Sequence, residues 1–213
     1  MKTTPTLFIL GDSISIQYGP HLERYLAGSF HDARKQGETE ALLNLDIPAG
    51  ANGGDSSMVL HYLRAAPQHG EIGSPDYLLI NCGLHDIKID PESGEKQIGP
   101  QLYRANLEGI AAAAGILGGR FVWIRTTPCD ENIHNARQQQ FHRFGADVRE
   151  YNRIADEVMR GRMVPIIDLY SFTQTLASGP DLFIDHVHFP VHVQELQAAF
   201  IAGCLTALKA DTR

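Results

Sequence analysis

Short apolar runs alternate with longer amphipathic segments along nearly the whole of this 213-residue chain. The runs predict strands at residues 6–10, 42–47, 77–82, 121–126 and 164–169, and the amphipathic segments predict helices at 21–28, 56–67, 101–117, 147–160 and 191–209. Near-continuous hydrophobicity is typical of parallel strands that are covered on both faces. Because crossovers between parallel strands are right-handed, the pattern predicts an α/β fold, a three-layer α/β/α sandwich with a parallel, flavodoxin-like five-stranded sheet.

No repeat, low-complexity tract or linker interrupts this pattern, so residues 1–213 are expected to form a single domain. Three polar stretches, at residues 29–40, 88–99 and 128–143, are expected to be loops that border a site.

The net charge of −7 argues against nucleic acid and anionic membranes as partners, since both attract clustered lysine and arginine. No apolar run approaches the length needed to cross a bilayer, and the first run is too short for a secretory leader. Cys82, Cys129 and Cys204 include no CxxC pair, which indicates free thiols in a reducing compartment. We therefore expect a cytoplasmic protein.

Residues with catalytic chemistry gather at the predicted strand ends, where parallel sheets bind their ligands. Gly11, Asp12 and Ser13 follow the first strand, Asn52, Gly53 and Gly54 the second, Gly83, His85 and Asp86 the third, while Asp185, His186 and His188 precede the last helix. Each group taken alone is typical of a turn or a helix cap. Together they contain a nucleophile, a base, an orienting acid and backbone N–H donors, which indicates a site for acyl transfer.

Asp185 stands three residues before His188, a spacing that lets the carboxylate meet the imidazole Nδ1 atom. The Nε2 atom would then face Ser13 as a general base, as in a Ser-His-Asp triad. A serine hydroxyl needs such a base because it is a weak nucleophile near neutral pH.

These groups, in this order, resemble the sequence blocks of the SGNH (GDSL) hydrolase superfamily of esterases and lipases. Gly11-Asp12-Ser13 matches the first block, Gly54 the second, and Asp185-x-x-His188 the last. The resemblance implies that Ser13 is the nucleophile, that His188 and Asp185 complete the triad, and that the N–H groups of Ser13 and Gly54 form the oxyanion hole.

The chain departs from the family at the third block, Gly-x-Asn-Asp, where it reads Gly83-Leu84-His85-Asp86. His85 therefore replaces the asparagine whose amide would donate to the oxyanion. An imidazole N–H is also a donor, so we expect His85 to complete the oxyanion hole. The alternative is that His85 only holds its loop and the hole has two donors.

The resemblance implies a serine esterase that needs no cofactor. The polar loops favour a small-molecule or glycan ester with a short acyl group, such as acetyl on a carbohydrate or another polar alcohol. Two alternatives remain open: an O-acyltransferase that uses the same serine, and a catalytically inactive carbohydrate-binding relative. His186, His188 and His192 are close in sequence but lack companion ligands at metal-binding spacing, so we predict no metal site. Cys82 is expected to be a core residue rather than a nucleophile.

Overall fold

Three strands with almost wholly buried side chains form the middle of a five-stranded sheet. They are β1 (Thr6–Leu10), β3 (Tyr77–Ile80) and β4 (Arg120–Ile124), flanked by the edge strands β2 (His31–Arg34) and β5 (Ile166–Ile167). The order is β2-β1-β3-β4-β5 and every pairing is parallel. This computed structural model describes residues 4–137, 140–177 and 179–211, and it confirms the flavodoxin-like sheet.

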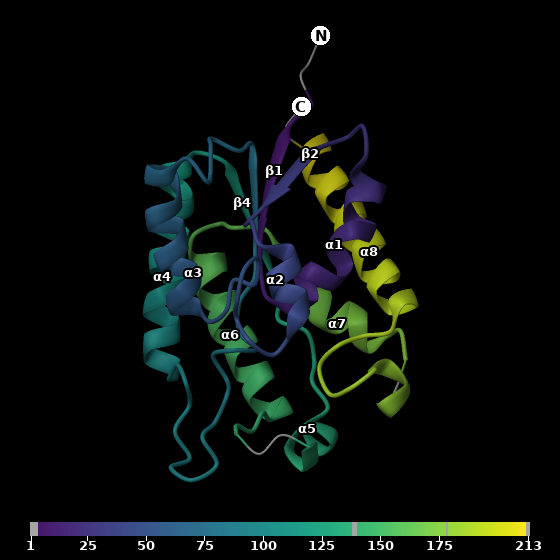
Figure 1. Ribbon diagram of the computed structural model, residues 1–213. Coiled ribbons are helices and arrows are strands. Elements are labelled where there is room, and N and C mark those ends of the chain that lie inside the picture. Colours follow the sequence, from purple (N-terminus) through teal and green to yellow (C-terminus); the bar gives the residue numbers. More distant parts are fainter. Residues whose placement is uncertain (1–3, 138–139, 178, 212–213) are drawn as a thin grey trace.

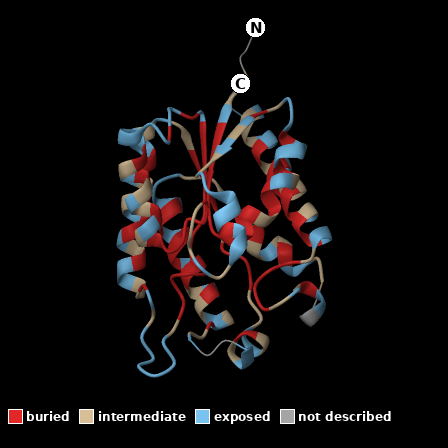
Figure 2. Ribbon diagram, viewed as in Figure 1, coloured by how far each residue is buried: buried red, intermediate tan, exposed pale blue. Residues whose placement is uncertain are grey.

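Helices cover both faces of the sheet (Figure 1). One layer contains α1 (Ser13–Leu26), α7 (Leu169–Gln174) and α8 (Val191–Ala210), and the other contains α3 (Ser56–Ala65), α4 (Pro100–Leu117) and α6 (Gly145–Gly161). The shorter elements are α2 (Glu38–Leu43), α5 (Glu131–Arg137), η1 (Ala66–His69) and η2 (Gly179–Leu182). Buried residues line the inner sides of the helices and the strands between them (Figure 2), so the core lies on both faces of the sheet.

The second strand is not where the sequence analysis placed it. Residues 42–47 include the end of α2 and a turn, and Leu42, Leu43 and Ile47 are exposed. The true strand, β2, lies within the predicted loop 29–40 and carries polar side chains. An edge strand that is half exposed needs no apolar run, which explains why hydrophobicity failed to identify it. The predicted loop 128–143 likewise contains α5.

Helix α8 is long and apolar enough to cross a membrane by length and composition alone, although its apolar residues form no unbroken run of that length. Gln194, Glu195 and Gln197 interrupt its apolar residues. In the structure α8 packs beside α1, and its buried face includes Val193, Ile201 and Leu205.

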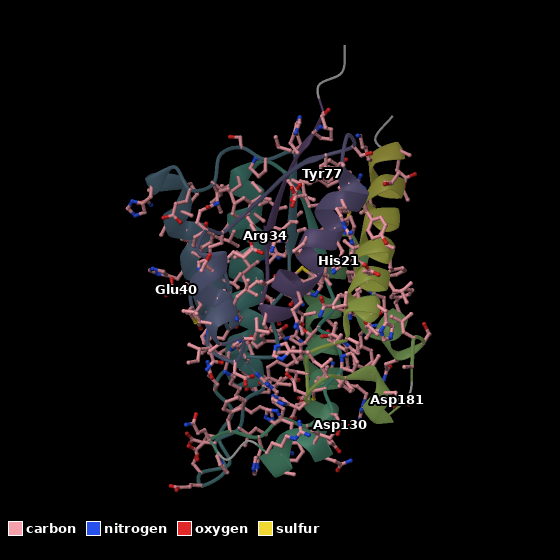
Figure 3. All side chains as sticks on the ribbon, turned by 45° about the vertical axis from the view of Figure 1, so that its right-hand side comes forward. His21, Arg34, Glu40, Tyr77, Asp130 and Asp181 are labelled. Atoms are coloured by element: carbon pink, nitrogen blue, oxygen red, sulfur yellow. The ribbon has the colours of Figure 1, made fainter. Side chains whose placement is uncertain are left out.

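The chemistry-bearing loops gather at one end of the sheet. Tyr77, the first residue of β3, and Asp130, in the loop after β4, lie near opposite ends of the molecule (Figure 3). The loop 88–99 lies beside the loop after β4, at the end of the molecule that carries Asp130. Ile89 and His142 exchange backbone hydrogen bonds of 2.8 and 2.9 Å there. The carboxyl ends of the strands therefore open into a region enclosed by loops.

Candidate active site

Ser13 is the first residue of α1 and follows β1 after only Gly11 and Asp12. Asp12 caps the helix, because its carboxylate accepts the N–H of Ile14 at 3.1 Å. The Ser13 N–H has no acceptor inside the helix, and the helix dipole is positive at this end. The serine therefore lies where backbone N–H groups can stabilise a developing negative charge.

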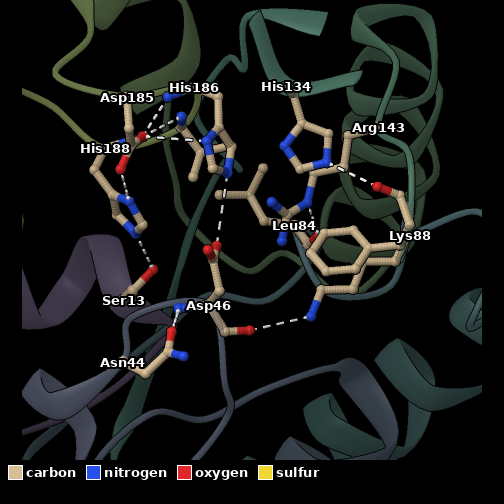
Figure 4. A network of polar contacts seen from close by, with 12 residues as sticks. Ser13, Asn44, Asp46, Leu84, Lys88, His134, Arg143, Asp185, His186 and His188 are labelled. Atoms are coloured by element: carbon tan, nitrogen blue, oxygen red, sulfur yellow. Dashed lines mark hydrogen bonds and ion pairs between the residues drawn. The ribbon is translucent and has the colours of Figure 1, made fainter. Parts of the chain in front are cut away.

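The structure brings Ser13, His188 and Asp185 into one hydrogen-bonded chain (Figure 4). The Ser13 Oγ atom lies 2.9 Å from Nε2 of His188, and Nδ1 of His188 lies 2.7 Å from Oδ2 of Asp185. Ser13 and His188 are buried. These are the distances that a nucleophile, its base and an orienting acid require.

Asp185 is held as a carboxylate. Burial alone would raise its pKa, but hydrogen bonds from the His188 side chain and from backbone N–H groups hold the pKa well below its usual range. Its Oδ1 atom accepts the N–H groups of His186, Val187 and His188. Because a carboxylate can only accept, His188 donates from Nδ1, and Nε2 is left to accept the Ser13 hydroxyl proton.

His85 lies in the turn that follows β3 and is buried. Burial, together with the positive charges of Lys88 and Arg143, lowers the pKa of His85 well below its ordinary value. The imidazole is therefore neutral near pH 7, with one donor and one acceptor nitrogen. Its Nδ1 atom has no hydrogen-bond partner among the described residues.

Gly54 was expected to supply its backbone N–H to the oxyanion, but that N–H is engaged elsewhere. Its backbone N–H already donates a 3.0 Å hydrogen bond to Oδ1 of Asn52. The φ angle of Gly54 is +71°, a conformation that favours glycine. The donor that the sequence analysis assigned to the oxyanion is thus occupied in this structure.

Arg143 belongs to this region, although the sequence analysis named it only as the end of a predicted loop. Its side chain is buried, and Nε donates a 2.8 Å hydrogen bond to the carbonyl oxygen of Leu84, beside His85. The guanidinium carbon lies 4.9 Å from the ring centroid of Phe141. An arginine in a polar loop gives no local sign that it will be buried, so tertiary structure was needed to find it.

Asp46, which follows α2, contacts His186 in the catalytic loop, the loop of residues 185–188 that carries Asp185 and His188 (Figure 4). The Oδ1 atom of Asp46 lies 3.7 Å from Nε2 of His186, a contact that lowers the pKa of Asp46 to about 2. The His186 ring also packs on His134, with ring centroids 4.4 Å apart. No set of three potential metal-ligating side chains with suitable geometry occurs within the described ranges.

A cavity of about 780 Å³ opens next to these residues. Its lining is largely polar and includes Asp46, Lys88, Glu95, Lys96, Gln97 and the ring of Phe141. Lys88 lies 4.4 Å from the Phe141 centroid, and burial lowers its pKa to about 8. Asp46 lines the cavity and contacts His186, two residues before His188 in the sequence.

Cys82 lies two residues after the end of β3 and is buried. Burial and nearby carboxylates raise the pKa of its thiol well above the ordinary value. A neutral buried thiol is a poor nucleophile, as expected for a core residue.

Comparisons with known proteins agree with this fold. The model of the family described as GDSL-like Lipase/Acylhydrolase matches residues 7–201. A search of curated proteins gives no match. A lipase/acylhydrolase from Enterococcus faecalis has a similar structure, with a TM-score of 0.70, 19% identity, and coverage of 95% of this chain and 96% of that one.

Two further solved structures are similar at low identity. The acetyl xylan esterase AlAXEase has a TM-score of 0.65 at 13% identity and covers 93% of this chain and 98% of its own. Est24, a carbohydrate acetylesterase from Sinorhizobium meliloti, has a TM-score of 0.65 at 15% identity, with coverage of 96% and 99%. At these identities the similarity establishes the fold.

Proposed function

The chain belongs to the GDSL-like lipase/acylhydrolase family and is an ester hydrolase, and from this premise we propose that it is a serine esterase that removes a short acyl group from a polar alcohol such as a carbohydrate. The observation that carries the proposal is the continuous hydrogen-bonded chain from the Ser13 hydroxyl through His188 to Asp185.

In the first half of the reaction, the Ser13 Oγ atom attacks the ester carbonyl carbon while Nε2 of His188 takes the hydroxyl proton. The carbonyl π electrons move onto oxygen and form a tetrahedral oxyanion. When the carbonyl re-forms, the C–O bond to the alcohol breaks, and His188 returns the proton to the leaving oxygen. Asp185 stabilises the imidazolium that exists between these two steps.

In the second half, water attacks the acyl-Ser13 ester and His188 takes the water proton. Collapse of the second tetrahedral intermediate breaks the bond to Ser13 Oγ, which recovers its proton from His188. The products are the free acid and the original enzyme. In this mechanism the Ser13 N–H and the His85 imidazole N–H donate hydrogen bonds to the oxyanion.

The polar cavity supports a polar alcohol. Carboxylates, amides and lysines in its lining can bind hydroxyl groups. Two proteins of similar fold are an acetyl xylan esterase and a carbohydrate acetylesterase, which agrees with this substrate class.

The test is a series of p-nitrophenyl esters from acetate to palmitate, measured with the wild type and with Ser13→Ala, followed by acetylated xylo-oligosaccharides. We expect the highest kcat/KM with acetate, release of acetate from the oligosaccharides, and a kcat lower by about 10⁴–10⁶ in Ser13→Ala. Preference for palmitate would contradict the substrate class. Activity near the wild-type level in Ser13→Ala would contradict the mechanism, and transfer of the acyl group to an added sugar would establish an acyltransferase instead.

A further inference from the structure

The Asn52 side chain is fully buried but only half of its hydrogen-bonding capacity is used. Its Oδ1 atom accepts the Gly54 N–H at 3.0 Å, while Nδ2 has no partner within the described part of the chain. Because an N–H must face an acceptor, this bond determines the orientation of the carboxamide: Oδ1 toward Gly54 and Nδ2 away from it. A buried amide donor without a partner is uncommon in a native protein and calls for an explanation.

Two hydrogen bonds from backbone N–H groups connect residues 52–56 to the loop that carries Ser13 and to the turn that carries His85. The N–H of Gly53 donates to the carbonyl oxygen of Gly11 at 2.8 Å, two residues before Ser13. The N–H of Ser56 donates to Oδ1 of Asp86 at 2.9 Å, and Asp86 directly follows His85. Asn52 therefore stands where the two loops that carry the proposed oxyanion donors converge.

The Gly54 N–H cannot donate to an oxyanion while it is bonded to Asn52. The carboxamide, however, accepts at one end and can donate at the other, and a hydrogen bond to its oxygen polarises the amide and strengthens the remaining donor. We propose that Nδ2 of Asn52, and not the backbone N–H of Gly54, is the donor that this loop supplies to the oxyanion of the tetrahedral intermediate. The inference rests on the acyl-serine mechanism proposed above.

This assignment also accounts for the departure at the third sequence block. In the family that the chain resembles, an asparagine amide at the position of His85 donates to the oxyanion. Here that position holds a neutral imidazole, and the proposed amide donor comes from a different loop, the one that carries Asn52. The chain thus keeps an amide donor while it changes the residue that carries it.

The alternative is that Asn52 only holds the turn at Gly54, and two variants separate the roles. Asn52→Ala removes both the acceptor and the donor and leaves the Gly54 N–H without its partner. If Asn52 is an oxyanion donor, kcat for p-nitrophenyl acetate falls by about 10²–10³ while KM changes little. If it only holds the turn, the released Gly54 N–H can serve the oxyanion, and kcat stays near the wild-type value or rises.

Asn52→Asp keeps the acceptor for Gly54 and the shape of the side chain but loses the donor at neutral pH. We expect its kcat relative to the wild type to be low at pH 7 and to recover as the pH falls, because a protonated carboxyl group donates again. A ratio that does not change with pH would overturn the proposal. The Asp variant also provides the readout if Asn52→Ala does not fold, which thermal unfolding monitored by circular dichroism will show.

The experiments distinguish an error in the Asn52 assignment from an error in the proposed esterase activity. If the wild type hydrolyses the ester and Ser13→Ala does not, the serine mechanism stands whatever Asn52 does. Wild-type kcat in both Asn52 variants would then reject the Asn52 donor alone. A wild type without esterase activity, or with activity independent of Ser13, would reject both.

Discussion

Nε2 of His188 lies 2.9 Å from the hydroxyl oxygen of Ser13, although 175 residues separate the two in sequence. The contact arises because α1 and α8 pack side by side on one face of the sheet. Ser13 begins α1, and His188 lies in the loop that leads into α8. The packing of two helices therefore positions the proposed base on the proposed nucleophile.

The triad is expected to act as one unit. Ser13→Ala and His188→Ala should each lower kcat by about 10⁴–10⁶, and Asp185→Asn by about 10³–10⁴, since the imidazole would lose its orienting carboxylate. The double variant Ser13→Ala/His188→Ala should be no slower than either single variant. Steady-state kinetics with p-nitrophenyl acetate measure this, and additive losses in the double variant would contradict the prediction.

His85 is expected to donate a hydrogen bond to the oxyanion. His85→Ala should lower kcat by about 10²–10³, the usual effect of losing one such donor. His85→Asn supplies an amide donor at the same position and should recover most of the activity. Wild-type kcat in both variants would mean that His85 only supports its turn.

Gly83 is expected to tolerate no side chain. Its φ angle is +152°, and a Cβ atom there would lie 2.2 Å from Oγ1 of Thr126, which itself donates to the Cys82 carbonyl oxygen. Gly83→Ala should therefore lower the free energy of unfolding by about 2 kcal/mol or more.

Gly73→Ala is the matched control for this change, because Gly73 is an exposed residue outside the helices and strands and nothing lies within 4 Å of a Cβ atom there. Its free energy of unfolding should stay within about 0.5 kcal/mol of the wild type. Urea titration of both variants tests the pair, and equal stabilities would show that the turn at Gly83 can relax.

His134 should make stability depend on pH. Burial, followed by the charge of Arg143, lowers the pKa of His134 to about 3, whereas the unfolded imidazole titrates near 6.5. Between these values the unfolded chain binds a proton that the native chain does not. The free energy of unfolding therefore falls as the pH drops from about 6.5 to 3, by up to ~1.4 kcal/mol per pH unit from this group.

His134→Gln removes this titration and should flatten the profile. Urea unfolding at several pH values between 3 and 7 gives the free energy of each protein, and the difference between wild type and variant isolates the contribution of His134. Parallel profiles would show that the native imidazole titrates as it does in the unfolded chain.

The inner strands could be predicted from sequence because both of their faces are buried. β1 and β3 lie within predicted runs, β4 begins one residue before its predicted run, and their apolar side chains fill the core. The edge strand β2 could not be found in this way, since its polar residues alternate between exposed and half-buried positions. The exposed leucines of α2, Leu42 and Leu43, produced the opposite error, because their apolar run predicted a strand at residues 42–47 where none exists.

The amino-acid sequence by itself determined the three inner strands, the Gly11-Asp12-Ser13 turn that follows the first of them, and the short spacing between Asp185 and His188. These are local properties, in which hydrophobic period, helix capping and turn residues act over a few neighbours. Tertiary structure alone decided which distant groups meet. The Asn52 carboxamide was brought between two loops, and Arg143 was buried against Leu84, 59 residues away. Such contacts depend on how helices and loops pack around the sheet, and no short stretch of sequence records that packing.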